Sequence, residues 1–209
     1  AACEGASVVV HLAGVVRDLR ATGVGAVKVA GRAKALRDLL PLLEVGRAEA
    51  ASVGGDASAV AGASGASGAP GARQRTVLIA MGMSGVASRI LAAHFRSCWT
   101  YAGPAVAPGQ IEASRLLHEF RFRTITPHTH VYAVVGQPIT HSISPAMHNA
   151  AFAAEGIDAV YIPCEAADID DFFALAVALP IVGSSVTAPF KLAAYERSEA
   201  MDDDVRQVG

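Results

Sequence analysis

The stretch Gly136-Gln137-Pro138-Ile139-Thr140-His141-Ser142-Ile143-Ser144-Pro145 follows an apolar run at residues 130–135. The run, closed by a glycine and a proline, predicts a buried strand. Ser144 suits a helix N-cap with Pro145 in the first turn, because the N–H that proline lacks has no intrahelical partner there. The free backbone N–H groups of such a helix start, together with the hydroxyls of Ser142 and Ser144, suit a carboxylate. An ordinary capped helix is the alternative.

A second stretch, Val182-Gly183-Ser184-Ser185-Val186-Thr187-Ala188-Pro189-Phe190-Lys191, ends another short strand with a hydroxyl and an amine. Together, the two stretches resemble the substrate-binding domain of shikimate dehydrogenase. In that family, a G-x-P-x-x-H-S-x-S-P loop and an [NS]-V-T-x-P-x-K loop flank one pocket. The resemblance covers the chain from about Val131 to its end, and it implies an α/β substrate-binding domain.

The resemblance also implies a role for individual side chains. Ser142 and Ser144 are expected to hold the carboxylate of shikimate. Thr187 is expected to bind a ring hydroxyl, and Lys191 to be the catalytic lysine. Ser185 stands where many single-function members have Asn, and in this it is similar to the plant-type enzymes that are fused to a dehydratase.

The composition limits the class of protein. With 209 residues, 52% of them hydrophobic and 17% charged, the chain is able to bury a core in one or two domains. A formal net charge of −2 argues against a nucleic-acid partner. No apolar run reaches the roughly 20 residues of a membrane span, and no leader pattern is seen, so we expect a cytoplasmic protein. Cys3, Cys98 and Cys164 are expected to be reduced thiols.

Strands alternate with helices along the chain, which predicts an α/β fold with parallel strands. The predicted strands are 24–30, 76–80, 98–102, 130–136, 159–164 and 182–187. The predicted helices are 12–19, 33–44, 84–95, 111–120, 145–155, 168–179 and 190–200. Residues 46–75, rich in Ala, Gly and Ser, are expected to be a flexible insertion, and residues 122–129 a linker between domains at 1–121 and 130–209.

Lys28 lies inside the apolar run at residues 26–30. Both faces of a parallel strand are usually covered, so this lysine is expected in an interior or at a strand end. Desolvation lowers the pKa of a lysine, and a neutral amine is able to attack a ketone and form an imine. A strand-end lysine that reaches water is the alternative.

The surroundings of Lys28 resemble a second family. Residues 81–89 (M-G-M-S-G-V-A-S-R) and 107–110 (A-P-G-Q) are similar to two consecutive motifs of type I 3-dehydroquinate dehydratase, a (β/α)8 barrel. The resemblance runs from about residue 14 to 120 and implies the last three β/α units of the barrel. By position, Lys28 matches the Schiff-base lysine, Arg89 the arginine that pairs with the substrate carboxylate, and Gln110 the glutamine of the second motif.

Two positions depart from the dehydratase pattern. Val106 stands where the family has Ser, which removes one substrate hydrogen bond. The catalytic histidine of the family lies well before the lysine, whereas His11 is the only histidine upstream of Lys28 and is interpreted as a helix-start residue. The remaining histidines, among them His128 and His130, which are expected to face solvent, show no metal-ligand spacing, and Asp202–Asp204 is interpreted as a solvated helix end.

The sequence therefore predicts a piece of a bifunctional 3-dehydroquinate dehydratase/shikimate dehydrogenase that acts on small-molecule substrates. Its expected fold is a partial (β/α)8 barrel followed by an α/β substrate-binding domain. NADP is the expected cofactor, bound by a domain outside this chain, because no G-x-G-x-x-G follows a strand here. Two alternatives stay open: a single-function shikimate or quinate/shikimate dehydrogenase with an inactive N-terminal half, and a non-enzymatic module that binds a polyhydroxy acid.

Overall fold

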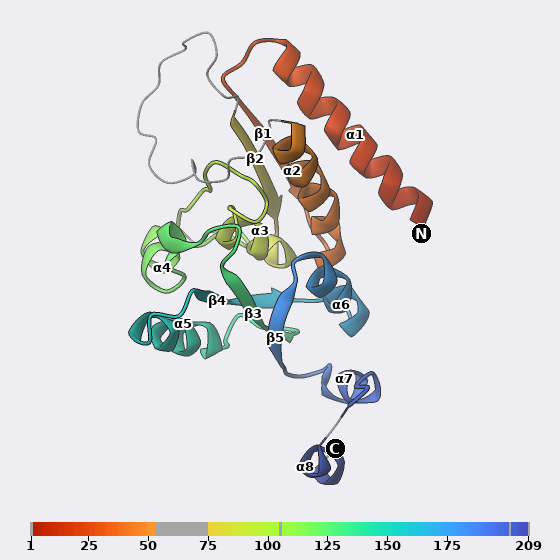
Figure 1. The fold of residues 1–209 in the computed structure, drawn as a ribbon, viewed down its shortest axis with the longest axis vertical. Coiled ribbons are helices and arrows are strands. Elements are labelled where there is room, and N and C mark those ends of the chain that lie inside the picture. The colour runs from red at the N-terminus through yellow and green to blue at the C-terminus, as the bar shows by residue number, and fades with distance from the viewer. Residues whose placement is uncertain (1, 53–74, 105, 201, 209) are drawn as a thin grey trace.

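A computed structural model describes residues 2–52, 75–104, 106–200 and 202–208, and its described part is an α/β structure with parallel strands (Figure 1). The strands are β1 (Ala26–Arg32), β2 (Arg75–Met81), β3 (His130–Gly136), β4 (Ala159–Glu165) and β5 (Ile181–Val186). The α-helices are α1 (Ala2–Ala21), α2 (Leu40–Ser52), α3 (Val86–Ile90), α4 (Ala113–His118), α5 (Ser144–Ala154), α6 (Ile169–Ala178), α7 (Lys191–Glu196) and α8 (Asp203–Val208). Single 3-10 turns are η1 (Leu36–Leu39), η3 (Met83–Gly85) and η4 (Phe122–Thr124).

The N-terminal half is built on one parallel strand pair. β1 and β2 pair in register from Ala26 opposite Arg75 to Arg32 opposite Met81. β2 is buried along nearly its whole length, as its apolar sequence predicts, whereas only Val27 of β1 is buried. Two paired strands do not show a partial barrel, so that part of the expected fold stays a prediction.

A third strand at residues 98–102 was predicted, and that prediction is wrong. The Cys98 N–H donates to the Thr76 carbonyl (2.9 Å), so the segment touches β2 only where it begins. Further along, the Tyr101 carbonyl accepts from the guanidinium of Arg89 (3.2 Å) instead of joining a ladder. The apolar pattern of residues 98–102 predicts a strand, but the structure shows none there.

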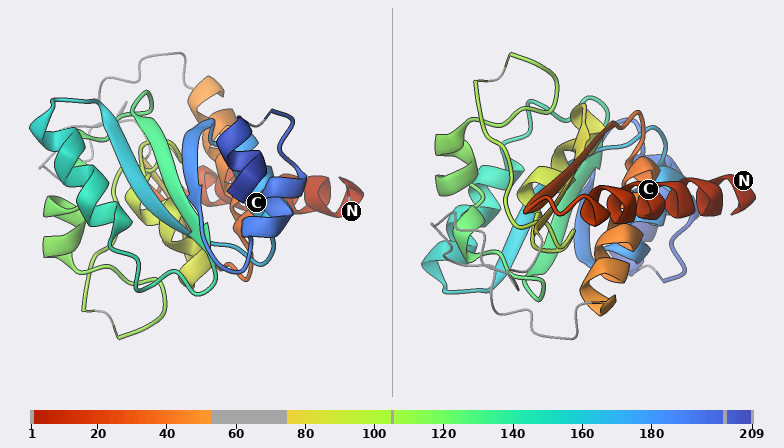
Figure 2. Two further views of the ribbon diagram at one scale, coloured as in Figure 1. Left: turned by 90° about the horizontal axis from the view of Figure 1, so that it is seen from below. Right: turned by 90° about the horizontal axis from the view of Figure 1, so that it is seen from above.

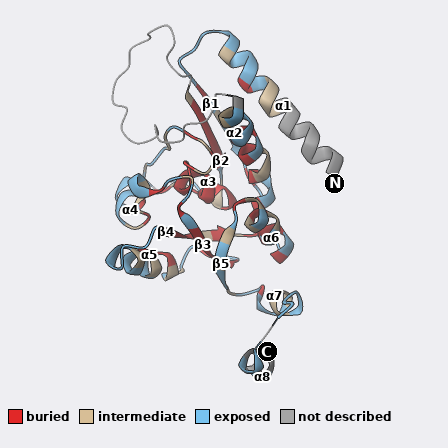
Figure 3. Ribbon diagram, in the orientation of Figure 1, coloured by how far each residue is buried: buried red, intermediate tan, exposed pale blue. Residues whose placement is uncertain are grey.

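The C-terminal half contains a three-stranded parallel sheet in the order β4–β3–β5 (Figure 2, left). β3 is central and carries the apolar run that begins the deciding stretch, and Ala133 and Val135 are fully buried. β5 lies at an edge, and Figure 3 shows it less buried than β3. Val182 of β5 is 55% exposed.

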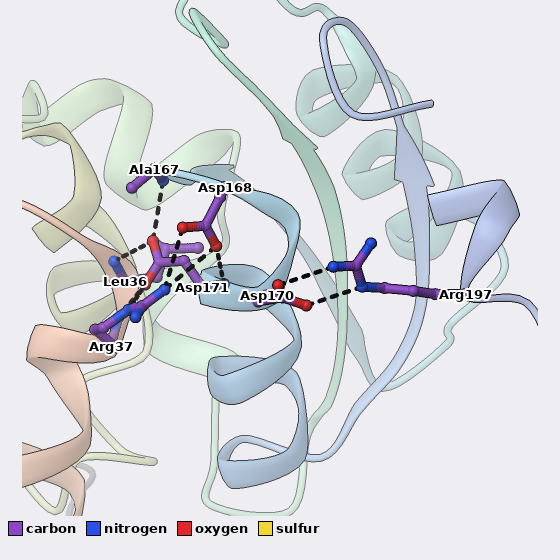
Figure 4. Close-up of polar contacts among 7 residues, drawn as sticks. All are labelled: Leu36, Arg37, Ala167, Asp168, Asp170, Asp171 and Arg197. Carbon is purple, nitrogen blue, oxygen red and sulfur yellow. Dashed lines mark hydrogen bonds and ion pairs between the residues drawn. The ribbon is translucent and has the colours of Figure 1, made fainter. Parts of the chain in front are cut away.

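A buried carboxylate joins the two halves (Figure 4). Asp171 of α6 is 0% exposed, and its oxygens accept from the backbone N–H groups of Leu36 (2.8 Å), Arg37 (2.8 Å) and Ala167 (3.0 Å) and from Arg37 Nε (3.0 Å). Burial by itself would raise the pKa of Asp171, but these hydrogen bonds together hold it below its ordinary value. Asp168 caps α6 by accepting from the Asp171 N–H (2.7 Å).

One hydrophobic core also runs through both halves. Leu36 and Phe95 from the N-terminal half and Val135 and Phe172 from the C-terminal half belong to the same buried cluster. The connecting residues 122–129 are part of this packing and do not form a free linker, since Ile125 and Thr129 are buried within them. The halves are therefore held by contacts along their whole boundary.

Several element boundaries differ from the predictions. Residues 46–52 of the predicted insertion are helical in α2, and residues 53–74 lie outside the described part of the chain. The helix predicted at 84–95 ends at Ile90, and Arg96 (φ 56°) closes the turns that follow it. α1 begins at Ala2, so His11 lies in the middle of a helix and not at its start. The helix predicted at 190–200 is the shorter α7.

Candidate functional site

The loops after β3 and β5 meet at one edge of the sheet. β3 and β5 are parallel neighbours, so their carboxyl ends lie side by side, the position where open α/β sheets bind ligands. The Thr187 N–H donates to the Val135 carbonyl (2.9 Å), and the Gln137 N–H donates to the Ala188 carbonyl (3.1 Å). The two stretches that the sequence singled out are thus hydrogen-bonded to each other.

Gly136 allows the two loops to cross at close range. A Cβ atom at this position would lie 2.4 Å from Thr187 Cγ2 and 3.0 Å from the Ala188 carbonyl oxygen. Only a residue without a side chain fits, so the glycine is explained by the close approach of the loop that carries Thr187.

Ser142 and Ser144 lie where the loop after β3 enters α5, and both are half-buried. The prediction that Ser144 caps this helix is wrong, because α5 begins at Ser144 and no side chain caps it from Ile143. Ser142 takes a capping role instead, since its Oγ accepts from the Ser144 N–H (3.3 Å). The two hydroxyls therefore lie on adjacent turns of chain at a helix N-terminus, and this arrangement suits an anion.

Lys191 is the first residue of α7 and is exposed. A tight turn connects it to Thr187, in which the Phe190 N–H donates to the Thr187 carbonyl (3.0 Å). Thr187 itself is half-buried. Thr187 and Lys191 thus both lie on the segment that follows β5.

A network beside this edge was not expected from the sequence. The Tyr161 hydroxyl, on β4, donates to Ser185 Oγ on β5 (2.8 Å), and the His148 ring stacks on the Tyr161 ring at 4.3 Å. The Asn149 side chain holds the Tyr161 backbone through two hydrogen bonds. The only signal in the sequence was an aromatic residue on a predicted strand, which indicates packing as often as it indicates a site.

In the N-terminal half, Tyr101 connects two of the predicted site residues. Lys28 Nζ lies 4.1 Å from the centre of the Tyr101 ring, and Arg89 Nη1 donates to the Tyr101 carbonyl (3.2 Å). Arg89 is buried, and burial lowers its pKa; its Nε has no hydrogen-bond partner among the described residues. A desolvated guanidinium with an unused donor suits an anionic ligand.

Lys28 itself does not lie in an interior or at a strand end. It is exposed in the middle of β1, because among the described residues β1 has only β2 as a neighbour. Val106, the departure from the dehydratase pattern, is 82% exposed.

Gln110 lies at the boundary between the halves, and its Oε1 atom is buried without a hydrogen-bond partner. The preceding Gly109 (φ 80°) passes so close to the Gly82 carbonyl that a Cβ atom would lie 2.1 Å from that oxygen. Gln110 and Ser142 line the same cavity of about 70 Å³. The structure therefore places Gln110 near the serine loop of the other half.

Other expectations concern metals, membranes and thiols. Within residues 2–52, 75–104, 106–200 and 202–208, no group of three His, Cys, Asp or Glu side chains is placed to hold a metal ion. No described helix combines the length and the apolar character that crossing a bilayer requires. Cys98 and Cys164 are free thiols, and His128 and His130 are exposed as expected. Asp203 and Asp204, also exposed, begin α8.

Comparison with known proteins identifies relatives of both halves. Residues 134–209 match the family model described as the shikimate dehydrogenase substrate binding domain. The chain is 33% identical over 138 residues (64% of this chain) to the chloroplastic bifunctional 3-dehydroquinate dehydratase/shikimate dehydrogenase of Arabidopsis thaliana. It is 32% identical over 133 residues (61% of this chain) to the shikimate biosynthesis protein AroDE of Chlamydia pneumoniae.

The chain spans 23% and 28% of the length of these two relatives. Among solved structures, shikimate dehydrogenase from Aquifex aeolicus is 32% identical, with a TM-score of 0.39 over 41% of this chain and 33% of that one. The matched residues 134–209 contain both loops that cross at the sheet edge. Over residues 134–209, this chain is therefore similar to the shikimate dehydrogenase substrate binding domain family.

Proposed function

We propose that this chain is the substrate-binding part of a shikimate-pathway enzyme, and that its C-terminal half holds shikimate or 3-dehydroshikimate at the crossing of the β3 and β5 loops. The observation that carries the proposal is this crossing, because it hydrogen-bonds the segment after β3, which contains Ser142 and Ser144, to the segment after β5, which leads to Lys191. The similarity of residues 134–209 to the substrate-binding family supports it.

Each group at the crossing binds a different part of such a ligand. The hydroxyls of Ser142 and Ser144, at the positive end of α5, bind the carboxylate. Thr187 binds a ring hydroxyl, and Lys191 holds or moves the proton at the C3 oxygen. The hydride is supplied by NADPH, which we assign to a domain outside this chain, since relatives are named shikimate dehydrogenase (NADP(+)).

For the N-terminal half we propose the dehydration of 3-dehydroquinate. The Lys28 amine adds to the C3 ketone and expels water, which leaves an iminium. The iminium withdraws electrons while the neighbouring carbon loses a proton to water and the hydroxyl group departs as a second water. Hydrolysis of the iminium by one water then releases the product and restores the amine. The arrangement of Lys28 and Arg89 around Tyr101 supports this assignment, because Arg89 has an unused donor for the substrate carboxylate.

The alternative of a single-function shikimate or quinate/shikimate dehydrogenase has its own support. Lys28 is exposed and is not enclosed in an interior, where an imine-forming lysine was expected. Val106 stands where the dehydratase motif has Ser. In this alternative, the N-terminal half is a structural partner of the substrate-binding domain.

Isothermal calorimetry with shikimate tests the binding part of the proposal on this chain. Ser144→Ala is expected to weaken binding by about tenfold or more, because it removes a hydrogen bond to a charged group. Ser114→Ala, at an exposed position of α4, is the matched control and is expected to leave binding unchanged. Absence of binding to the wild-type chain would refute the proposed site.

Catalysis is tested in the protein extended by its nicotinamide-binding domain. Lys191→Ala is expected to abolish the NADPH-dependent reduction of 3-dehydroshikimate and to change shikimate affinity less than about tenfold, because the carboxylate contacts remain. Lys34→Ala is the control lysine. Lost binding with intact turnover would contradict the role of Lys191, and any turnover by the wild type excludes a purely non-enzymatic binding module.

A further inference from the structure

A small cavity lies between the two halves of the chain. Gly109 and Gln110 line it from the N-terminal half, and Thr140 and Ser142 line it from the loop after β3. Its volume is about 70 Å³. Ligand pockets for drug-sized molecules usually have volumes of several hundred Å³, so this cavity is too small for a six-membered ring but large enough for water.

Gln110 and Ser142, which both line the cavity, have hydrogen-bonding capacity that no described residue fills. Gln110 Oε1 is buried and accepts no hydrogen bond from the described residues. Ser142 Oγ accepts from the Ser144 N–H, and no described residue is recorded as the acceptor of its hydroxyl proton. A buried unpaired acceptor is costly, and a water molecule with two or more polar partners satisfies it.

The two walls are also held in a fixed relation. Gly109 crosses the Gly82 carbonyl at close range, which fixes the loop that carries Gln110. On the other side, Ile139 is buried and its N–H donates to Glu165 Oε2 (3.4 Å), which supports the serine loop. The Asp171 hydrogen bonds and the common core hold the halves together, so Gln110 keeps its position relative to the serine loop.

We propose, on the basis of the proposed function, that Gln110 is a positioning residue of the Ser142 site in the other half. Through water in the shared cavity, Gln110 orients the Ser142 hydroxyl that receives the ligand carboxylate. The carboxylate site of the C-terminal half is thus completed by a residue of the N-terminal half. Because the Gln110 amide is neutral, it does not repel an anion bound at the serine loop.

Opposite charges introduced at Gln110 test this inference. At pH 8, Gln110→Glu is expected to weaken the binding of shikimate about tenfold, and Gln110→Lys is expected to strengthen it several-fold, because a charge behind Ser142 acts on the bound carboxylate. Shikimate methyl ester, which has no charge, is expected to change by less than about twofold with both variants. Gln207→Glu, at an exposed position of α8, is the control.

The outcomes are distinct. Changes of opposite sign in the affinity for shikimate, absent for the ester, support the inference. A disturbed fold would change the affinity of both variants for both ligands in the same direction, so packing effects are separated from charge effects. Shikimate binding unchanged by either variant, or equal losses for acid and ester, would overturn the inference and leave the proposed function standing. No shikimate binding to wild type would overturn the proposed function and this inference with it. If one variant does not fold, the sign of the other still decides.

Discussion

The replacement of Asp171 by Asn is expected to destabilise the chain strongly, because this carboxylate is the polar centre of the boundary between the halves. Each of its oxygens accepts two hydrogen bonds, from Leu36 and Ala167 on one oxygen and from two groups of Arg37 on the other. Asn keeps the shape but offers one acceptor oxygen, so at least two donors lose their partner. At about 1–3 kcal/mol for each donor, the loss is about 2–6 kcal/mol.

Asp170→Asn is the matched control for this substitution. Asp170 is in the same helix and carries the same charge, but its ion pair with Arg197 is exposed (Figure 4). Such a pair contributes about 0–1 kcal/mol. The pKa of Asp171 lies below its ordinary value, so its contribution is complete above about pH 4 and is lost at lower pH, and the comparison is made at pH 7.

Urea unfolding followed by two signals measures the effect. The single tryptophan, Trp99, reports on the N-terminal half by fluorescence, and far-ultraviolet circular dichroism reports on the whole chain. In the wild type the two transitions are expected to coincide; in Asp171→Asn the fluorescence transition is expected at lower urea than the dichroism transition, because the halves uncouple. A loss below about 1 kcal/mol, equal to that of Asp170→Asn, would refute the assignment of Asp171 as the joint.

Three further predictions follow from single contacts. Burial lowers the pKa of His94 and outweighs the hydrogen bond from its Nε2 to the Thr129 carbonyl, which raises it. Stability is therefore expected to fall as pH drops below 6.5, less so in His94→Gln, with exposed His118→Gln unchanged in thermal unfolding. Gly136→Ala is expected to lower the free energy of unfolding in urea by about 1–3 kcal/mol and to weaken shikimate binding. Gly25→Ala, where the added Cβ faces open space, is expected to change neither the stability nor the binding. Reduction with borohydride in the presence of 3-dehydroquinate is expected to leave the substrate covalently bound to Lys28, detected by mass spectrometry. No adduct on the wild type, or an adduct retained in Lys28→Ala, contradicts the dehydratase role.

The order of strands and helices was largely predictable from the sequence because it depends on local signals. The run at residues 130–135 became the central strand β3, and strand predictions at 76–80 and 159–164 agree with β2 and β4 to within one residue. The exception, residues 98–102, shows where the signal fails. An apolar run has the same pattern whether it joins a sheet or packs against side chains, and here the Tyr101 carbonyl accepts from Arg89 and not from a neighbouring strand.

The site was predictable in its residue types and less so in its contacts. The motif placed Ser142 and Ser144 at a helix start, but which of them caps the helix depended on the final turn of the loop. Tyr101 and Tyr161 were missed, because their importance lies in what they touch across strands and loops.

The sequence by itself determined the alternation of strands and helices, the glycine and proline breaks, and the supply of hydroxyls, amines and a guanidinium at loop positions. These properties follow from backbone geometry and from chemistry within a few residues. Only the tertiary structure decided that Gln110 faces the Ser142 loop, that Asp171 binds the amides of Leu36 and Arg37, and that Lys28 is exposed. Such relations join residues tens to more than a hundred positions apart, and they depend on which surfaces the chain buries together.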